Sequence, residues 1–164
     1  GEGGSSENQY FDDLATAPGN DVVRIKSFEI LPSKPQANID IESGIKFCLQ
    51  FMCYKPDAML DVNMQVRTMD DVSVFQVGSM LGEVGKKDSM KGLYSVEFEI
   101  KPYTLNAGKY KAEIFFGENQ RYMVYSGFEQ FFDVDNTLSD MGFNQSVMPG
   151  LLRPRNDFKI LFKG

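Results

Sequence analysis

Few residues of this chain carry chemistry that could build a catalytic or metal site. The chain contains no histidine, which is the commonest general base and metal ligand in proteins. A His-based catalytic triad and the usual zinc sites are therefore excluded. Gly85-Lys86 resembles part of a phosphate-binding loop, but Met80 stands where that loop needs glycine and Lys87 where it needs serine or threonine. We interpret this stretch as a flexible hairpin loop.

The acidic residues and the cysteines do not define a site either. Asp133, Asp135 and Asp140 resemble part of a calcium-binding loop, but the glycine and the closing glutamate of an EF-hand do not follow. Cys48 and Cys53 lie in one expected strand, on opposite faces and about 16 Å apart, which is beyond disulfide reach. No pair of carboxylates stands out as a glycosidase site. The sequence therefore predicts a protein that is not an enzyme and uses no metal or cofactor.

Composition limits the partners. The 164 residues suffice for one domain with a core, and a hydrophobic content of 42% indicates a globular chain. The net charge of −6 opposes binding to nucleic acid or to an anionic membrane surface, because both need a basic footprint. No apolar run reaches the roughly 18 residues of a spanning helix, so we expect no membrane insertion. The first residues lack the basic and apolar regions of a signal peptide.

Short segments in which apolar and polar residues alternate predict an all-β, antiparallel Ig-like β-sandwich with Greek-key connections. The expected strands are Val22–Ile30, Ile39–Ile41, Ile45–Tyr54, Leu60–Val66, Val72–Val77, Tyr94–Ile100, Tyr110–Phe116, Arg121–Tyr125 and Phe128–Val134. Leu105-Asn106-Ala107-Gly108-Lys109-Tyr110 has the form of a tyrosine corner, in which the Tyr hydroxyl bonds to upstream backbone. This corner places Tyr110 inside and leaves Glu113 and Phe115 outside. Residues 1–20 read as a flexible linker and 21–164 as the sandwich.

The outward-facing side chains mix amides, charged groups and aromatic rings, a combination that can bind sugar. Rings stack on the apolar side of a pyranose, and amides and guanidinium groups bond its hydroxyls. The candidate contacts are Gln50, Tyr54, Asn63, Gln65, Arg67, Glu113, Phe115 and Tyr125. Whether their strands share one sheet is left open, because sandwich connections cross between sheets. The alternative interpretation is an ordinary solvated face, and the absence of tryptophan weakens a sugar-stacking argument.

A series of short motifs, in order, resembles one known family. The motifs are Ala17-Pro18-Gly19, Val23-Arg24-Ile25, Asp70–Phe75, Ile100-Lys101-Pro102, Leu105–Tyr110, Phe132-Asp133-Val134 and Gly150–Pro154. Together they resemble the C-terminal carbohydrate-binding domain of Wzt-type ATP-binding subunits of bacterial polysaccharide (O-antigen) ABC transporters. The resemblance runs from about Ala17 to about Phe158. It departs from the family in lacking a glycine near Val72 and in having Phe158 where tryptophan is common.

This resemblance implies a non-catalytic domain that recognises a lipid-linked polysaccharide in the cytoplasm, at the inner face of the inner membrane. It also implies an ATPase domain before the linker, contact with the transporter's membrane subunit through the parent protein, and a homodimer. The segment 149–164 is the candidate for strand exchange in that dimer. No sugar-binding motif can be transferred from the family, so the candidate contacts rest on strand alternation. The alternatives are an Ig-like protein–protein interaction module and a secreted glycan-binding accessory domain.

Overall fold

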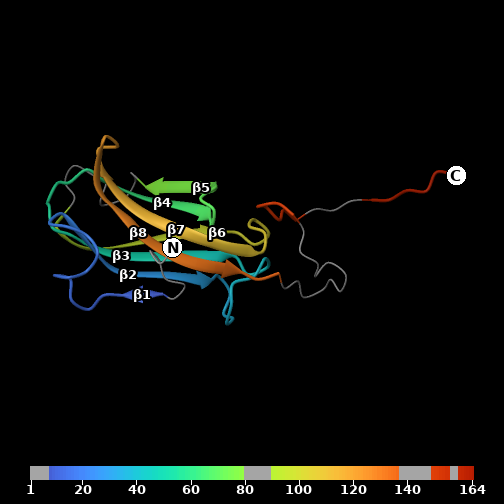
Figure 1. Cartoon of the computed structure of the whole chain (residues 1–164), viewed down its shortest axis with the longest axis horizontal. Coiled ribbons are helices and arrows are strands. Elements are labelled where there is room, and N and C mark those ends of the chain that lie inside the picture. Colours follow the sequence, from blue (N-terminus) through green and yellow to red (C-terminus); the bar gives the residue numbers. More distant parts are fainter. Residues whose placement is uncertain (1–7, 80–89, 137–148, 156–158) are drawn as a thin grey trace.

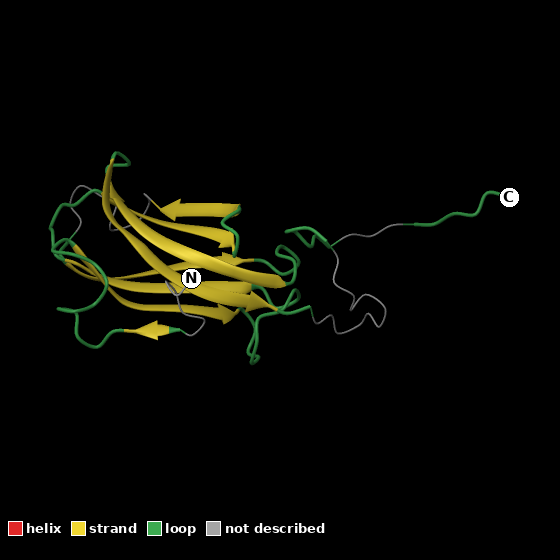
Figure 2. Cartoon of the chain, in the orientation of Figure 1, coloured by secondary structure: helices red, strands yellow, loops and turns green. Residues whose placement is uncertain are grey.

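The chain folds into two stacked sheets (Figure 1), because the alternation of apolar and polar side chains gives each strand one apolar side to bury. The computed structural model describes residues 8–79, 90–136, 149–155 and 159–164. The strands in these ranges are β1 (Gln9–Tyr10), β2 (Val23–Pro32), β3 (Ile45–Cys53), β4 (Leu60–Thr68), β5 (Ser73–Ser79), β6 (Gly92–Ile100), β7 (Gly108–Glu118) and β8 (Tyr122–Val134). They form two four-stranded sheets in the orders β1-β2-β3-β6 and β5-β4-β7-β8. Among the described residues the structure consists of strands and loops (Figure 2).

The two sheets face each other and bury the apolar side of each strand. Along β3, buried and half-buried residues alternate without interruption. Its Phe51 meets Phe116 of β7 edge-on, with ring centroids 4.9 Å apart, and its Phe47 meets Phe132 of β8 at 5.6 Å. The chain changes sheets between β3 and β4, between β5 and β6 and between β6 and β7. The predicted antiparallel Ig-like β-sandwich with Greek-key connections is therefore confirmed.

The tyrosine corner lies where the chain crosses from β6 to β7. The Tyr110 hydroxyl donates a hydrogen bond of 2.7 Å to the backbone oxygen of Asn106. Its ring stacks on Phe132 with 5.5 Å between centroids. Burial raises the pKa of the Tyr110 hydroxyl above its ordinary value, so the group stays protonated and able to donate. As expected, Ala112, Ile114 and Phe116 follow on the buried side of β7.

The prediction of a short strand at Ile39–Ile41 is wrong. Both isoleucines are buried, but Asp40 between them forms only an isolated bridge to Asp135. The Ile41 N–H donates to the Asp135 oxygen at 3.1 Å, and the Asp135 N–H donates to the Ile39 oxygen at 2.9 Å. A turn closed by the Ser43 N–H on the Asp40 oxygen, at 3.3 Å, follows at once. The pattern of two buried isoleucines here marks anchored loop residues rather than a strand.

The stretch Tyr122–Val134 forms one strand where the sequence predicts two. β8 pairs with β7 from Glu118 back to Gly108, with register shifts around Phe116. Gly127 adopts φ = 100° at this point, a conformation that glycine reaches without strain. Such a β-bulge adds a residue to one strand and resets its alternation. The reset makes one continuous strand look like two in the sequence.

Part of the range expected to be a linker lies against the sandwich. Gln9 and Tyr10 of β1 pair with Phe28 and Ser27 of β2, and the Ala17 side chain is buried. The Phe11 N–H continues this contact by donating to the backbone oxygen of Lys26 at 2.8 Å. A two-residue strand is too short to show alternation, so sequence pattern could not reveal β1.

The residues that precede the C-terminal tail lie along the corner. Leu152 bridges Leu105 in antiparallel fashion, and the Asn106 N–H donates to the Leu151 oxygen at 3.0 Å. The Asn106 side-chain amide adds a bond of 2.7 Å to the Gly150 oxygen. Residues 159–164 then extend away from the sandwich (Figure 1).

The cysteines are free thiols on opposite faces of β3, as expected. Cys53 is buried and Cys48 half-buried. Loss of hydration on burial is the main cause, and a hydrogen bond from the thiol to Glu97 the second, of the rise in the pKa of Cys48 to about 11. At neutral pH Cys48 is therefore a protonated thiol and a poor nucleophile. Gly85-Lys86 and Asp140 lie outside the described residues.

Candidate functional site

The outward side of the sheet β5-β4-β7-β8, called the outer face below, gathers most of the expected contact residues. β4 and β7 are adjacent and antiparallel, and their register places Asn63 opposite Phe115 and Gln65 opposite Glu113. Arg67 follows on the same side of β4. All of these side chains are half-buried. Alternation along two neighbouring strands therefore produces a continuous surface of amide, guanidinium, carboxylate and ring.

Hydrogen bonds fix the polar side chains of the outer face in place. Arg67 Nη2 donates to Gln65 Oε1 at 2.7 Å, and Gln65 Nε2 donates to Ser73 Oγ, at the start of β5, at 3.1 Å. Side chains held in this way lose little conformational entropy when they bind a ligand. This row of polar side chains, Gln65, Arg67 and Ser73, is therefore preorganised for hydrogen bonding to a flat or extended ligand.

An ion pair borders this row. Lys111 of β7 donates a hydrogen bond to the carboxylate of Asp71, in the turn before β5. This hydrogen bond lowers the pKa of Asp71 and raises the pKa of Lys111. Both groups are consequently charged at neutral pH and already engaged with each other. Lys111 thus adds less positive potential to the outer face than its position suggests.

Sequence pattern did not single out Asp61, although it lies at one end of this face. Asp61 is 5% exposed. Its Oδ1 accepts a hydrogen bond of 2.8 Å from Asn63 Nδ2, and its Oδ2 accepts one of 2.9 Å from the Gln120 N–H. Gln120 belongs to the turn between β7 and β8, in which Asn119 and Gln120 have φ of 57° and 54°. Asp61 therefore connects the candidate contact Asn63 to the neighbouring hairpin turn.

A small hollow opens beside Asp61. Its volume is about 180 Å³, and Phe115 and Tyr122 are among its lining residues. Gly117 belongs to the same lining, and a side-chain carbon there would come within 2.5 Å of Asp61 Oδ1. Gly117 pairs directly opposite Asp61, and its missing side chain leaves room for the Asp61 carboxylate. A glycine inside a strand is the sequence signal that could have indicated this close approach.

Three of the expected contacts lie elsewhere: Gln50, Tyr54 and Tyr125. Gln50 belongs to β3 in the other sheet, opposite Ser27 and Ser95. Tyr54 follows the end of β3, where its N–H donates to the Val22 oxygen at 2.8 Å. Tyr125 pairs with Phe116 and packs against the core. The structure therefore does not bring these three side chains together with the outer face.

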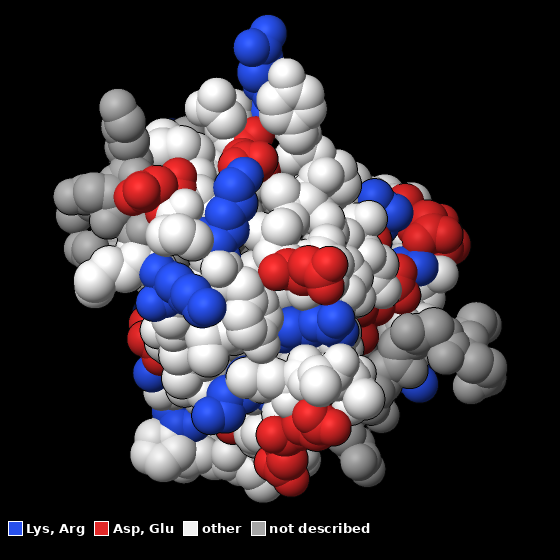
Figure 3. Space-filling view, turned by 90° about the vertical axis from the view of Figure 1, so that its left-hand side faces the viewer, with Lys and Arg blue, Asp and Glu red and all other residues white. Residues whose placement is uncertain are grey.

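The remaining observations concern charge, metals and membranes. At the end of the sandwich that carries the β7–β8 turn, acidic and basic side chains are interspersed (Figure 3). Within the described ranges, no cluster of three or more acidic or cysteine side chains is arranged to hold a metal ion. In the same part of the chain, no helical segment has the length and hydrophobicity needed to traverse a bilayer.

Two antiparallel sheets with a polar, partly hollowed outer face place this chain in the class of β-sandwich domains. The crystal structure of the C-terminal domain of Wzt has the same fold: the TM-score is 0.61, and the match covers 93% of this chain and 98% of that chain at 16% identity. A Niemann-Pick type C2 protein from Japanese carpenter ant matches with a TM-score of 0.43, covering 71% of this chain and 95% of that one at 17% identity. No family model and no curated protein sequence matches. The likeness to the Wzt C-terminal domain that the sequence motifs indicate is thus present in the fold.

Proposed function

We propose that this domain recognises a lipid-linked bacterial polysaccharide of the O-antigen type, without catalysis, for export by an ABC transporter. The observation that carries the proposal is the outer face, where an aromatic ring, two amides and a guanidinium group lie on adjacent strands. The fold shared with the Wzt C-terminal domain supports it. In this proposal the domain works in the cytoplasm at the inner face of the inner membrane and meets the membrane subunit through a parent protein.

The chemistry of the outer face suits a sugar chain. The Phe115 ring offers an apolar surface for the C–H side of a pyranose, and Asn63 and Gln65 both donate and accept hydrogen bonds. Each hydrogen bond contributes about 1 kcal/mol net, so one site binds weakly. A repeating polymer that engages several sites on a dimer gains avidity without new contacts.

Binding to the polysaccharide of the source organism tests the proposal. We expect the chain to bind that glycan in isothermal titration calorimetry, and we expect Phe115→Ala and Arg67→Ala each to weaken binding about tenfold or more, because each removes a central contact. The matched control is Leu93→Ala, which truncates a side chain that is 50% exposed on the other sheet. It should leave the affinity unchanged.

Two results would count against this proposal in different ways. Full binding by both outer-face variants would refute the choice of face while leaving glycan recognition intact. If the unmodified chain bound no glycan but captured a defined protein partner, the protein–protein interaction alternative would replace it.

We also propose that the chain forms a homodimer through its C-terminal tail. Ile160, Leu161 and Phe162 are 86%, 71% and 95% exposed in the isolated chain. Three consecutive exposed apolar side chains favour burial against another surface, and an extended segment can add to a sheet edge of a second copy. β5 and β6 are outermost strands of the two sheets and offer such edges.

Removal of the tail should change the oligomeric state. We expect the complete chain to elute as a dimer in size-exclusion chromatography with light scattering, and a chain ending at Arg155 to elute as a monomer. The triple variant Ile160→Ser, Leu161→Ser, Phe162→Ser, which keeps the length, should behave like the shortened chain. A dimer that survives both changes would show that the tail does not hold the two copies together.

A further inference from the structure

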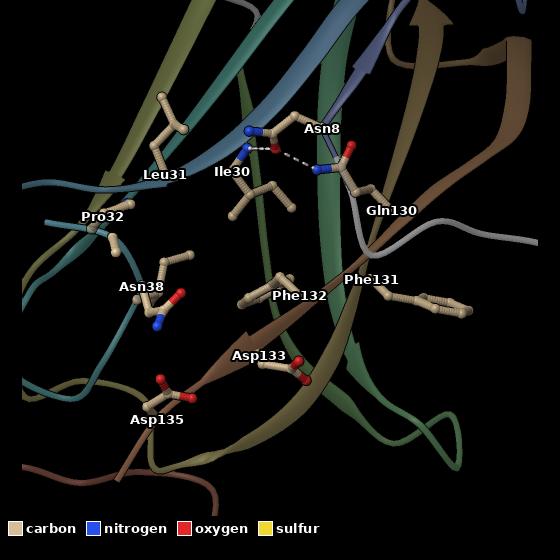
Figure 4. A pocket seen from close by; sticks show the side chains of 12 residues that line it. Asn8, Ile30, Leu31, Pro32, Asn38, Gln130, Phe131, Phe132, Asp133 and Asp135 are labelled. Carbon is tan, nitrogen blue, oxygen red and sulfur yellow. Dashed lines mark hydrogen bonds between the residues drawn. The ribbon is translucent and has the colours of Figure 1, made fainter. Parts of the chain in front are cut away.

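A second hollow lies away from the strands β4 and β7, at the open side of the sandwich between β2 and β8 (Figure 4). Its volume is about 480 Å³, within the range of roughly 300–1,000 Å³ that small-molecule sites occupy. Ile30, Ile39 and Phe132 supply apolar wall, and Asn8 closes one end. The hollow is thus large enough for a small ligand and has both apolar and polar lining.

Partly buried hydrogen bonds hold the shape of this hollow. Asn8 Oδ1 accepts one bond of 2.8 Å from the Ile30 N–H of β2 and a second of 2.9 Å from Gln130 Nε2 of β8. Gln130 itself is 1% exposed, and Gln9 Nε2 donates to the neighbouring Glu129 oxygen at 3.1 Å. The residues before and in β1 therefore connect the two sheets at their open side (Figure 4). Such a connection keeps the walls a fixed distance apart.

Several polar groups around the hollow remain available to a ligand. Because the oxygen of Asn8 is occupied, its Nδ2 group is left as a donor. The side chains of Asn38 and Asp135 lie around the same opening, whereas the Asp133 carboxylate points to the other side of β8, as Phe131 does (Figure 4). Among the described residues, none of these groups has a side-chain hydrogen-bond partner. Amides that donate and carboxylates that accept are together suited to hydroxyl groups, which do both.

The charge of the lining restricts the ligand further. The lining includes the carboxylate of Asp135, and none of the residues described as lining it is lysine or arginine. An acidic sugar or a phosphate would therefore meet like charge without compensation. A neutral sugar, or one with an amino group, meets no such penalty. The apolar wall of Ile30 and Phe132 can cover the C–H side of its ring.

We propose that this hollow is a second sugar subsite, which binds one sugar residue that carries no acidic group. The inference rests on the proposed function, since it names the class of sugar that the same glycan must contain. A polysaccharide that is long enough can occupy the outer face and this subsite together, which raises the effective concentration at the second site. Because Asn8 borders the subsite, a sugar bound there also stabilises the contact of β1 with β2.

Nuclear magnetic resonance of the complete 15N-labelled chain tests the subsite with defined probes. D-mannose, D-galactose, D-glucosamine and D-glucuronic acid are each added to about 100 mM, a range that reaches weak millimolar affinities. We expect at least one of the first three to shift the side-chain amide signals of Asn8, Asn38 and Gln130. D-glucuronic acid should shift them several-fold less.

Variants separate the subsite from general sugar effects. Asn38→Ala and Asp135→Ala should each reduce the remaining shifts several-fold. The control Glu99→Ala, which removes an exposed carboxylate on β6, should not. Absence of shifts with mannose, galactose and glucosamine would overturn the inference, as would equal shifts with glucuronic acid or shifts that persist in both variants.

The same probes distinguish failure of the inference from failure of the proposed function. Polysaccharide binding that depends on Phe115, with unmoved amide signals in the hollow, would overturn the subsite and leave the function standing. Amide shifts in the hollow, without Phe115-dependent binding of polysaccharide, would support the subsite and refute the outer face. If neither Phe115-dependent polysaccharide binding nor amide shifts in the hollow were observed, both proposals would be refuted.

Discussion

Phe116→Ala is expected to lower the free energy of unfolding by about 3–5 kcal/mol, the usual cost of truncating a buried phenylalanine. Phe116 is fully buried between the sheets, and its ring meets that of Phe51 at 4.9 Å. Tyr94 also stacks on Phe51, with ring centroids 5.7 Å apart, so the cavity would open inside a packed aromatic cluster. Urea denaturation followed by circular dichroism measures the loss.

The adjacent residue supplies a matched control on the same strand. The variant Phe115→Ala removes the same type of side chain, but Phe115 points to the outer face. It should therefore lower the free energy of unfolding by about 1 kcal/mol or less. The two variants should also differ in binding: Phe115→Ala loses affinity for the glycan, while Phe116→Ala retains it under conditions in which the protein is folded. Equal losses of stability would contradict the assignment of one ring to the core and the other to the surface.

Asp61→Ala is expected to weaken glycan binding about tenfold and to lower the free energy of unfolding by about 1–3 kcal/mol, because it removes a charged acceptor that holds two hydrogen bonds. The carboxylate accepts bonds from Asn63 and from the Gln120 N–H. Without it, the Asn63 amide loses its fixed orientation at the outer face, and the turn at Asn119-Gln120 loses an anchor. Calorimetry with the glycan and urea denaturation measure the two effects.

Two further variants separate the hydrogen bonds of Asp61 from its charge. Asp61→Asn keeps an acceptor for the Gln120 N–H but turns a second NH₂ group toward Asn63, so its losses should lie between those of the alanine variant and none. Glu99→Ala removes an exposed carboxylate from β6 and should change neither quantity. If Asp61→Ala bound the glycan as tightly as the unmodified chain, the orientation of Asn63 by Asp61 would play no part in recognition.

The fold was largely predictable from the sequence, because each long strand shows its own alternation. The pattern from Ile45 to Cys53 corresponds residue by residue to buried and half-buried positions of β3. The corner motif predicted the hydroxyl bond of Tyr110 and the outward direction of Phe115. The errors occurred where alternation is short or interrupted: at Ile39–Ile41, which is an anchored loop, and around Gly127, where a bulge resets the pattern.

The candidate site was predictable only in part, because a site requires neighbours and the sequence specifies only faces. Asn63 and Phe115 became one surface because β4 pairs with β7. Gln50 satisfies the same alternation rule, yet it lies on the other sheet. Asp61 fits the outward pattern of β4 but is covered by the β7–β8 turn, a contact between residues far apart in the chain.

The sequence by itself determined which side of each strand is apolar, since side chains alternate with a period of two and burial selects the apolar set. It also determined the position of the corner, because that motif is local. Only the tertiary structure decided which strands are neighbours, which polar residues share a surface, and where the chain leaves a hollow. Those properties depend on backbone pairing and on contacts between distant segments, such as Asn8 with Gln130, which no local pattern encodes.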